Sequence, residues 1–384
     1  GALAGAAALL PAFTRGSSPA RDTKAPILVA VELSGGNDGL NSIVPHGDDA
    51  YYRARPTIGI RQEQLLPLDD HFGFNPGMLG LQRLWQDGQL AIVHGCGYEQ
   101  ASYSHFTSMA YWHTGAPHSG DSLGWMGRTA DAMAPTYRDD MLINVAPSQS
   151  LAVRSAIHTP LVFDNPGRFQ RKYWLGGVPP SAVPATAVGN ANLDFLHALD
   201  RSAQTSSSRI RAAWARYKSS VDYGIAPMDL PKVAACIDAG LPTQLYYVQF
   251  RNNAFDTHVA QPALHRRLLS YACDGIHGFV KDLQRLGHAD RVVVMVFSEF
   301  GRRVPENANL GTDHGSANVM LLAGQPIKGG HYGKLPSLTD LIDGDNLRYT
   351  TDFRQVYATA IEGWLGVDAQ TVLHEHFATL PVFA

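Results

Sequence analysis

Short apolar runs alternate with amphipathic segments along most of this chain, and that alternation restricts the possible folds more than any other feature. The apolar runs predict buried strands, because they are short, rich in branched residues and bounded by Gly, Asn or Pro. They span residues 27–33, 89–96, 141–147, 244–250, 291–297 and 318–324. Helical periodicity fills intervals at residues 75–88, 102–114, 193–223, 261–287 and 352–366. This order predicts an α/β fold, a mostly parallel sheet with helices on both faces.

Composition sets the size of the fold and excludes some partners. The chain has 384 residues, 45% of them hydrophobic and 17% charged, which suits one large domain or two fused ones. We expect a single domain over residues 25–384, with a loop or cap insertion around residues 179–208, where Pro and Ser are frequent. The net charge of −3 gives no overall attraction to nucleic acid. The three scattered cysteines indicate neither a disulfide framework nor a thiolate zinc site, although one disulfide stays open.

The N-terminal segment differs from everything that follows it. Residues 1–13 form a weakly apolar Ala, Gly and Leu run that is too short for a membrane span, and a polar stretch follows at residues 14–26. We interpret residues 1–24 as the remnant of an export signal and a linker. Mild hydrophobicity is more typical of twin-arginine than of Sec signals, so a periplasmic or secreted location is expected. The alternative is an N-terminal arm of the folded protein.

Polar side chains follow three of the predicted strands directly. Carboxyl ends of parallel strands meet at one edge of a sheet, which is where α/β proteins bind ligands. Asp256 and His258 are two residues apart, so an extended backbone would place them on the same side. The side chains expected at this edge are Asp38, Asp256, His258, Glu299, Arg302, Arg303, Asp313 and His314.

The residue types at this edge indicate a metal. Imidazole and carboxylate together suit zinc, manganese or iron, whereas an all-oxygen site would suit calcium or magnesium. We therefore predict a divalent metal ion, with zinc or manganese favoured and calcium or magnesium possible. Asp256, His258 and His314 are the ligands that suit a transition metal best, and Asp38, Glu299 and Asp313 are further candidate ligands. Each pair alone is more typical of a helix cap or a surface hydrogen bond.

Several ordered motifs make the chain resemble a bacterial family named domain of unknown function 1501. They are "LSGGNDGLNSIVP", "FGFNPGM", "SHFTSMAYWHTG", "GWMGR", "FDTH", "FSEFGRR", "GTDHGSAN" and "DFRQVYATAIEGWLG". Members of that family resemble twin-arginine-exported proteins. The family is similar to the alkaline phosphatase and sulfatase superfamily, which hydrolyses or transfers phosphate and sulfate esters around one or two metal ions. The resemblance implies an alkaline phosphatase-like α/β/α sandwich.

The resemblance also assigns roles to individual positions. Asp38 becomes an acidic ligand after the first strand, and His314 becomes the last ligand histidine. Ser104 becomes the nucleophile at a helix start, with Ser102 as the alternative. The superfamily's strand-end Asp-His pair falls on Glu299 and Phe300, and Phe300 cannot bind a metal. The chain lacks the Cys/Ser-x-Pro-Ser-Arg sequence that directs formylglycine formation, so a standard sulfatase is not expected.

Other nearby side chains suit the same chemistry. Arg302 or Arg303 could bind non-bridging oxygens of an anion, together with backbone N–H groups of "SGGNDG". His105, next to Ser104, could serve as a general acid or base. In the alternative reading the arginines form structural salt bridges, Ser104 caps a helix and His105 is a surface residue.

We therefore predict an exported metal-dependent hydrolase of a phosphate or sulfate ester, whose substrate is a small-molecule or glycan-linked anionic ester. Two alternatives stay open. One is a non-catalytic binding or assembly protein on the same fold, for which Phe300 is the main argument. The other is a metal-dependent hydrolase of another bond.

Overall fold

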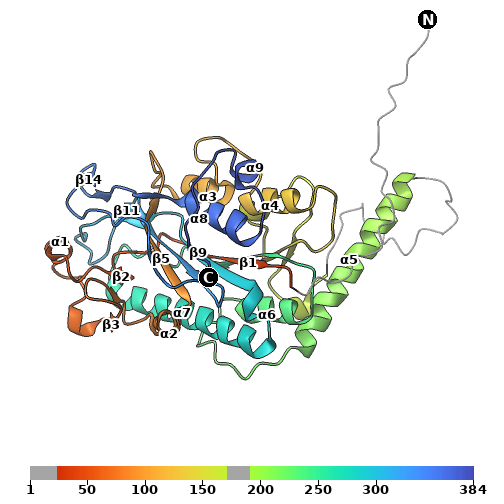
Figure 1. Ribbon diagram of the computed structural model, residues 1–384, viewed down its shortest axis with the longest axis horizontal. Coiled ribbons are helices and arrows are strands. Elements are labelled where there is room, and N and C mark those ends of the chain that lie inside the picture. The colour runs from red at the N-terminus through yellow and green to blue at the C-terminus, as the bar shows by residue number, and fades with distance from the viewer. Residues whose placement is uncertain (1–23, 171–190) are drawn as a thin grey trace, which may run out of the picture.

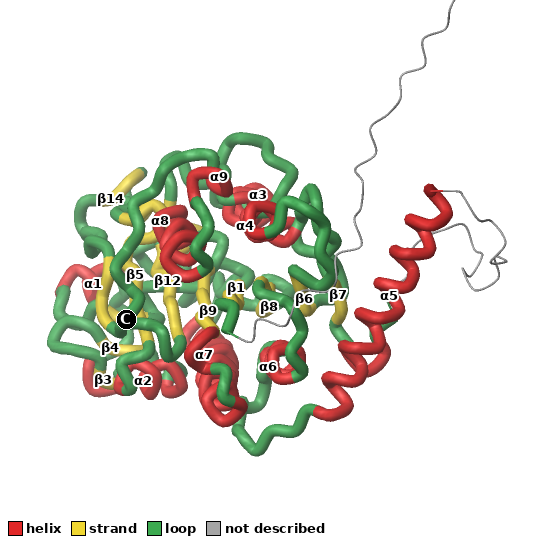
Figure 2. Tube along the Cα trace, turned by 45° about the vertical axis from the view of Figure 1, so that its right-hand side comes forward, coloured by secondary structure: helices red, strands yellow, loops and turns green. Residues whose placement is uncertain are grey.

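A large central sheet organises the molecule, as Figures 1 and 2 show. The structure is a computed structural model that describes residues 24–170 and 191–384, so the expected export segment and the first part of the expected insertion lie outside it. Within these ranges nine strands form the sheet in the order β13-β5-β12-β9-β1-β8-β6-β7, with β16 also paired to β5. Their bounds are β1 Ile27–Leu33, β5 Leu90–Gly97, β6 Leu142–Val145, β7 Leu161–Phe163, β8 Leu245–Phe250, β9 Val292–Phe297, β12 Asn318–Ala323, β13 Gly330–Tyr332 and β16 Thr351–Asp352.

Most of the strand pairs are parallel. Strand β1 runs parallel to both neighbours, with Val29 opposite Tyr246 of β8 and Val294 of β9. Strands β6 and β7 continue in the same direction, and β13 and β16 run parallel to β5. Strand β12 is antiparallel to β5 and β9. The predicted mostly parallel sheet is therefore confirmed, with β12 as its reversed strand.

Helices cover both faces of this sheet (Figure 2). Alternate residues of a strand point to opposite faces, so Val29 and Val31 pack with α2, α6 and α7, whereas Leu28 and Ala30 pack with α3, α4, α8 and α9. The fold is therefore a three-layer α/β/α sandwich. The helices are α1 Asp49–Ala54, α2 Leu79–Gln86, α3 His105–Thr114, α4 Trp125–Met133, α5 Ala191–Arg216, α6 Leu230–Asp238, α7 Gln261–Leu286, α8 Phe353–Ala358 and α9 Ala369–Leu373.

Local sequence explains where the main helices begin and end. Helix α7 has Pro262 in its first turn and ends at Gly287, which adopts the left-handed conformation that glycine accepts without strain. Helix α3 ends in the same way at Gly115. Helix α8 continues into a π-helix, Thr359–Trp364. Helix α5 begins at residue 191, so it occupies part of the region expected to form a loop or cap.

Short strands form three small sheets outside the main sheet, within the described residues. Strands β10 (Gly301–Arg302) and β11 (His314–Gly315) pair antiparallel, which sets Arg302 opposite His314. The other short strands are β2 Ile43–Val44, β3 Leu66–Pro67, β4 Gly73–Phe74, β14 Leu341–Ile342 and β15 Asn346–Leu347.

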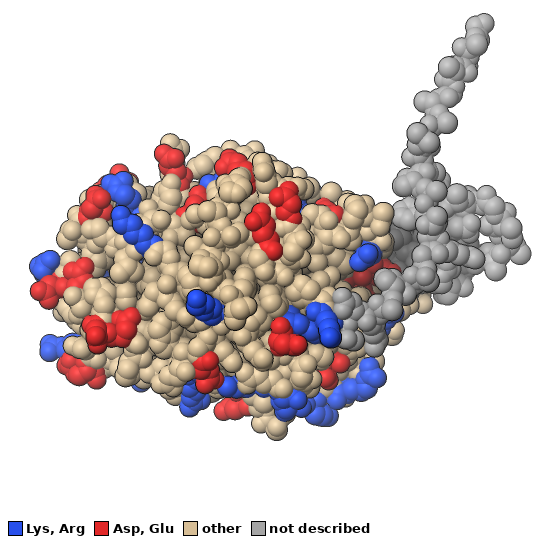
Figure 3. Space-filling view, in the orientation of Figure 1, with Lys and Arg blue, Asp and Glu red and all other residues tan. Residues whose placement is uncertain are grey.

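The surface and the cysteines limit what the molecule can bind. Acidic and basic side chains are interspersed on the face shown in Figure 3, which fits the low net charge. Cys96, Cys236 and Cys273 are buried and free, so none of them forms the disulfide that the sequence left open. Among the described residues, no helix has both the length and the apolar character that a membrane crossing requires.

Candidate metal centre

Adjacent strand ends carry the polar side chains of the candidate site. Strands β9, β1 and β8 are neighbours in the sheet, and their carboxyl ends lie together. Glu299 follows β9, and Asp256 lies in the loop after β8. His105 is the first residue of α3, and His314 belongs to β11. Segments far apart in the sequence therefore meet at one edge, where α/β proteins bind ligands.

Histidine side chains converge on one carboxylate. His258 Nε2 lies 2.9 Å and His314 Nε2 3.0 Å from Asp256 Oδ1. His105 Nε2 lies 3.4 Å from Asp256 Oδ2. The ligand atoms of His105, Asp256 and His314 all lie within 4.8 Å of one another. The structure thus brings together the predicted Asp256, His258 and His314 and adds His105. We call these four residues the His/Asp cluster.

The other ring nitrogen of each histidine contacts a hydrogen-bond acceptor. His105 Nδ1 lies 2.8 Å from Glu299 Oε1, and His314 Nδ1 lies 2.7 Å from the backbone oxygen of Tyr103. His258 Nδ1 lies 3.2 Å from Asp313 Oδ1. Acceptors of this kind place the proton on Nδ1, which directs the Nε2 lone pair into the cluster.

Such an arrangement calls for a cation. The Nε2 atoms of His258 and His314 are only 2.9 Å apart. Two lone pairs at that distance, beside a carboxylate, repel each other unless a proton or a metal ion lies between them. His105 Nε2 is buried and has no hydrogen-bond partner in the described part of the chain. Imidazole nitrogen and carboxylate oxygen together are the donor set of zinc and related transition metals. The residues therefore fit a metal ion.

The charges around the cluster favour an ionised Asp256. Burial acts to raise the pKa of this carboxyl, but hydrogen bonds from His314 and Arg302 outweigh burial and hold the pKa far below its usual range. At His105 the hydrogen bond to Glu299 raises the pKa of the imidazole, against the effect of burial. Asp256 is therefore available as an anionic ligand at neutral pH.

Arg302 forms an ion pair with the carboxylate of the cluster. Its side chain is buried and lies 2.7 Å from Asp256 Oδ1. Its remaining contacts are to backbone oxygens, which belong to Gly35, Gly36, Phe255 and Thr312. A guanidinium that is committed to these acceptors holds Asp256 in place. This placement does not suit the anion clamp expected from the sequence.

Glu299 and the glycine loop after β1 form a second support. The backbone N–H groups of Gly35 and Gly36 donate to the buried Glu299 carboxylate, at 2.8 Å and 3.1 Å. The sequence predicts that these N–H groups bind a substrate anion. In the structure they bind a carboxylate of the protein itself. Glu299 in turn orients His105 through the contact with its Nδ1. Glu299 therefore supports a ligand histidine and is not itself a metal ligand, in contrast to the prediction.

Other residues predicted for the site lie outside the His/Asp cluster. Asp38 is fully buried and pairs with Arg55 at 2.8 Å. Burial acts to raise the pKa of Asp38, but the Arg55 guanidinium reverses this and lowers it. Arg303 is part-exposed and pairs with Asp345 at 2.6 Å. Asp313 reaches the cluster only through His258.

Ser104 and Phe300 border the cluster. Ser104 is exposed and lies between Tyr103 and His105, both of which contact the cluster or belong to it. It stands at the N-cap of α3, yet its side chain makes no capping hydrogen bond. The ring of Phe300 packs 4.5 Å from the His314 ring and 4.9 Å from the His105 ring. His105 was expected to be an acid or base, and its neighbour Ser104 was the only sequence signal that placed it here.

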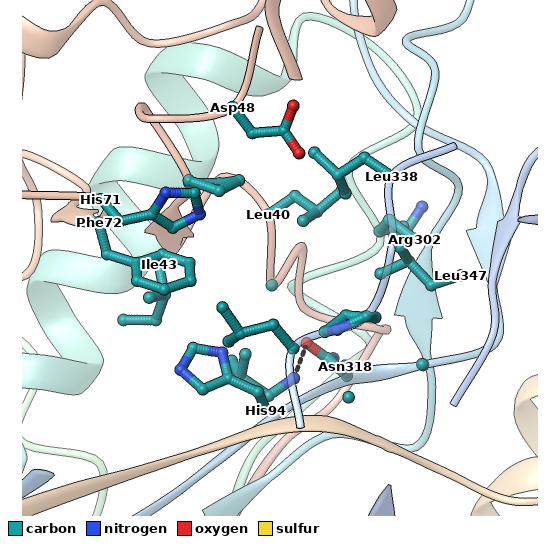
Figure 4. A pocket seen from close by; sticks show the side chains of 17 residues that line it. Leu40, Ile43, Asp48, His71, Phe72, His94, Arg302, Asn318, Leu338 and Leu347 are labelled. Atoms are coloured by element: carbon teal, nitrogen blue, oxygen red, sulfur yellow. Dashed lines mark hydrogen bonds between the residues drawn. The ribbon is translucent and has the colours of Figure 1, made fainter. Parts of the chain in front are cut away.

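A mostly apolar cavity of about 50 Å³ lies beside Arg302 (Figure 4). Leu40, Ile43, Phe72 and Leu338 line it, with His94 at one side. None of the His/Asp cluster residues lines this cavity. This cavity and the His/Asp cluster are therefore separate features, and the donor geometry, not the cavity, identifies the candidate site.

A further polar set lies near the carboxyl end of β1. The buried Glu32 contacts His113 of α3 at 3.0 Å, and Ser150 lies 3.4 Å from the other nitrogen of His113. None of these residues was predicted from the sequence as part of a site. A glutamate inside the apolar run "ILVAVEL" was the signal that could have found them.

A family model described as "Protein of unknown function (DUF1501)" matches residues 242–379. The matched range includes the motifs "FDTH", "FSEFGRR", "GTDHGSAN" and "DFRQVYATAIEGWLG", so the resemblance noted from the sequence is confirmed there. No curated protein matches the chain.

Several solved structures are similar to this chain at low identity. One is a protein in the alkaline phosphatase superfamily from Vibrio parahaemolyticus, with 10% identity and a TM-score of 0.42, covering 92% of this chain and 71% of that one. Another is the PsFucS1 sulfatase from Pseudoalteromonas sp., with 12% identity, a TM-score of 0.41 and coverages of 93% and 71%. A third is the phosphonate monoester hydrolase SpPMH from Silicibacter pomeroyi, with 9% identity, a TM-score of 0.39 and coverages of 93% and 76%.

Proposed function

Since residues 242–379 belong to the family described as protein of unknown function (DUF1501), we propose a function from the site itself: this chain is a metal-dependent hydrolase of phosphate or sulfate esters. The superfamily member, the sulfatase and the phosphonate hydrolase to which it is similar agree with this class of reaction, although their low TM-scores leave the argument to the site. The substrate class is a small-molecule or glycan-linked anionic ester.

One observation carries the proposal. Three histidines present Nε2 to the Asp256 carboxylate, and each has its Nδ1 held by an acceptor on another segment. An acceptor behind a ligand histidine fixes the orientation of the ring and raises its basicity as a ligand. Structural histidine pairs need no such convergence. We therefore assign His105, Asp256, His258 and His314 as the residues that hold a zinc or manganese ion.

The chemistry divides between the metal and the chain. A bound divalent ion lowers the pKa of a coordinated hydroxyl or water and stabilises negative charge on a transferring phosphoryl or sulfuryl group. Ser104 supplies the nucleophile, because its exposed hydroxyl stands beside His105 and forms no capping hydrogen bond. Arg303, the more exposed of the two arginines, is the cation that can meet the oxygens of an ester anion.

Metal analysis and a substrate screen on the same preparation test this function. Purified protein should contain about one equivalent of zinc or manganese, or take it up on dialysis, and should hydrolyse an aryl phosphate or an aryl sulfate. His258→Ala should lower both metal content and turnover. Ser104→Ala should lower kcat by about 100-fold or more and leave metal content unchanged. If Ser104→Ala keeps full turnover while His258→Ala abolishes it, a water molecule is the nucleophile.

A non-catalytic metal-binding protein is the second candidate, and Phe300 is the observation that favours it. The aromatic ring of Phe300 packs against both His105 and His314, and Phe300 follows Glu299 at a position where the superfamily pattern expects a ligand. Stoichiometric metal binding without hydrolysis of any phosphate or sulfate ester would support this candidate. Absence of metal binding in the presence of excess zinc and manganese would overturn both.

We also propose that the protein is exported to the periplasm or beyond. Support comes from the apolar run at residues 1–13. The location of the protein after cell fractionation tests this proposal. Recovery in the cytoplasmic fraction alone would contradict the proposal.

A further inference from the structure

Glu32 is a buried carboxylate in the central strand of the sheet. It lies within β1 and has no solvent exposure. Its Oε2 accepts hydrogen bonds from the Tyr247 hydroxyl and from Gln249 Nε2, and His113 Nε2 lies 3.0 Å away. Its Oε1 has no hydrogen-bond partner in the described part of the chain. Burying a charged group is unfavourable unless it is paired, and His113 is the ionisable partner that Glu32 has here.

The donors around Glu32 determine the tautomer of His113. Burial acts to raise the pKa of Glu32, but His113, Tyr247 and Gln249 together lower it, so the carboxylate is ionised and acts as an acceptor. Burial and the nearby Glu32 charge raise the pKa of Tyr247, so its hydroxyl stays protonated and donates. His113 Nε2 must then carry a proton to face the same oxygen. Its Nδ1 is left as an unprotonated base.

Ser150 lies opposite that base. Its Oγ is 3.4 Å from His113 Nδ1 and accepts a hydrogen bond from the Ala152 N–H at 3.1 Å. Since the oxygen already accepts from a backbone donor, its own proton can be donated to His113 Nδ1, and the oxygen of the nearby Tyr247 hydroxyl is the competing acceptor. Ser150 is part-exposed, whereas His113 is buried. A nucleophile and its base lie about 2.6–3.2 Å apart, and often somewhat farther apart without substrate, so the 3.4 Å between Ser150 and His113 is a loose contact of this kind.

We propose that Ser150, His113 and Glu32 form a second nucleophilic site, separate from the His/Asp cluster, which acts on uncharged carboxylic esters. Ser150 Oγ attacks the acyl carbon and its proton moves to His113 Nδ1; the new O–C bond forms as the ester C–O bond breaks. His113 returns the proton to the leaving alkoxide, and water then hydrolyses the acyl-serine by the reverse roles. Glu32 stabilises the positive imidazole between these steps.

Charge and position separate this site from the cluster. The negative Glu32 disfavours a dianionic phosphate and leaves a neutral acyl group as the better electrophile. His105 and His113 are the first and ninth residues of α3, so the sites lie at opposite ends of one helix, about 12 Å apart along its axis. The serine site uses no metal ligand of the cluster, so its reaction should not require a metal.

A fluorophosphonate probe tests the proposal on the full chain. The probe should form an Oγ–P bond at Ser150 with loss of fluoride, and peptide mass spectrometry should locate the adduct there. Labelling should persist in excess EDTA, and p-nitrophenyl acetate should be hydrolysed under the same conditions. Ser150→Ala should abolish the adduct. His113→Gln and Glu32→Gln should each slow labelling by about 100-fold or more.

Matched controls keep the outcome decisive. Ser148 is an exposed serine of the same loop, and Ser148→Ala should label at Ser150 at the wild-type rate. The absence of a Ser150 adduct in the wild-type protein would overturn the proposal, as would equal labelling rates in wild type and His113→Gln. If Glu32→Gln does not fold, the wild-type adduct and His113→Gln still decide. If the wild-type protein is labelled at Ser150 but hydrolyses no phosphate or sulfate ester, only the proposed function of the metal centre is refuted.

Discussion

At the scale of single residues, the second ring nitrogen of each histidine decides what the first can do. His105 is the clearest case, because its Nδ1 is held by a buried carboxylate and its Nε2 faces Asp256 Oδ2 at 3.4 Å. A carboxylate acceptor makes the imidazole a stronger ligand than a backbone carbonyl does. Glu299 is therefore a positioning residue, and its effect should appear in metal affinity before it appears in the chemical step.

Substitution of Glu299 tests that role. Glu299→Gln keeps the shape of the side chain but removes its charge, so we expect metal affinity to fall about 10- to 100-fold. Titration of apoprotein with zinc in a competing chelator measures the change. Glu375→Gln is the matched control. The Glu375 side chain is 68% exposed, and its ion pair with Arg354 is loose, at 3.8 Å. Equal affinities in all three proteins would show that Glu299 does not act on the metal.

Residue-scale prediction from the sequence succeeded where spacing alone carried the information. The two-residue interval between Asp256 and His258 suggested a shared ligand set, and the structure brings both to one point. The role of Arg302 could not be foreseen, because its partners are backbone oxygens of three separate segments. The sequence placed Glu299 correctly at the end of β9 but assigned it as a metal ligand. Only the tertiary structure shows that Glu299 contacts His105, which is the residue that faces the cluster.

At the scale of elements, the loop after β1 is shaped for close approach. Gly35 has φ of +118°, and a Cβ there would lie 2.4 Å from the backbone nitrogen of Asp256. The same loop donates its N–H groups to Glu299. A side chain at this position would therefore push the β1 loop away from the loop that carries Asp256.

We expect Gly35→Ala to destabilise the protein by about 2–4 kcal/mol, the sum of a positive-φ penalty and a steric clash. Gly88→Ala is the control, because Gly88 also has a positive φ, +71°, but nothing lies within 4 Å of its Cβ position. It should lose only about 1 kcal/mol. Urea denaturation of both variants measures the difference. Similar losses in the two variants would show that the close approach at Gly35 is not restrictive.

Strand β5 buries His94 against the exposed His331 of β13, and this histidine makes stability depend on pH. Burial lowers the pKa of His94 to about 3, with a further contribution from His331, whose Nδ1 lies 2.7 Å from His94 Nε2. The unfolded chain accepts a proton near pH 6.5, whereas folded His94 does not. The unfolded state therefore binds more protons between about pH 6.5 and 3, so stability falls as the pH is lowered through that range.

His94→Gln should flatten this dependence. Each proton taken up on unfolding contributes at most about 1.4 kcal/mol per pH unit, and the variant lacks one such group. Urea midpoints measured between pH 7 and pH 5 should therefore decline less steeply in His94→Gln than in wild type. The exposed His376 provides the control, and His376→Gln should keep the wild-type slope. An unchanged slope in His94→Gln would contradict the assignment.

Element order and the mostly parallel sheet were readable from the sequence, but the reversed direction of β12 was not. Apolar runs and helical periodicity located β1, β5, β6, β8, β9 and β12. Strand β12 runs antiparallel between β5 and β9, which a run of branched apolar residues cannot reveal, because direction follows from how the connecting segment crosses the sheet. Edge strands β7 and β13 are only three residues long, too short to produce a distinct pattern.

At the scale of the whole molecule, metal binding and folding should be linked. The cluster joins loops after β8 and β9 with the start of α3, so an ion bound there stabilises the folded state alone. Zinc at 100 times its Kd would add about 2.7 kcal/mol. The melting temperature should rise by several degrees with zinc or manganese and return on adding EDTA. His314→Ala should remove the shift, whereas the exposed His374→Ala should not; a shift that survives in His314→Ala would place the metal elsewhere.

The export segment leads to a prediction about the whole chain. A signal is removed before the mature protein functions, so residues 1–16 should add nothing to the stability of the α/β/α core. A protein that begins at Ser17 should have the same melting temperature and the same metal content as the full chain. A large loss of stability would identify the segment as a structural arm and would weaken the expected location.

Helix α3 carries His105 at its first turn and His113 at its last, and this has a mechanical consequence. An α-helix is stiff along its axis, so a ligand that draws its first residue toward Asp256 by a few tenths of an ångström must move the far end by a similar amount. That displacement changes the gap between His113 and Ser150, now 3.4 Å. The helix would then transmit the displacement from one site to the other. Vanadate bound at the metal end should therefore alter the rate at which a fluorophosphonate probe reacts with Ser150 at the other end of the helix.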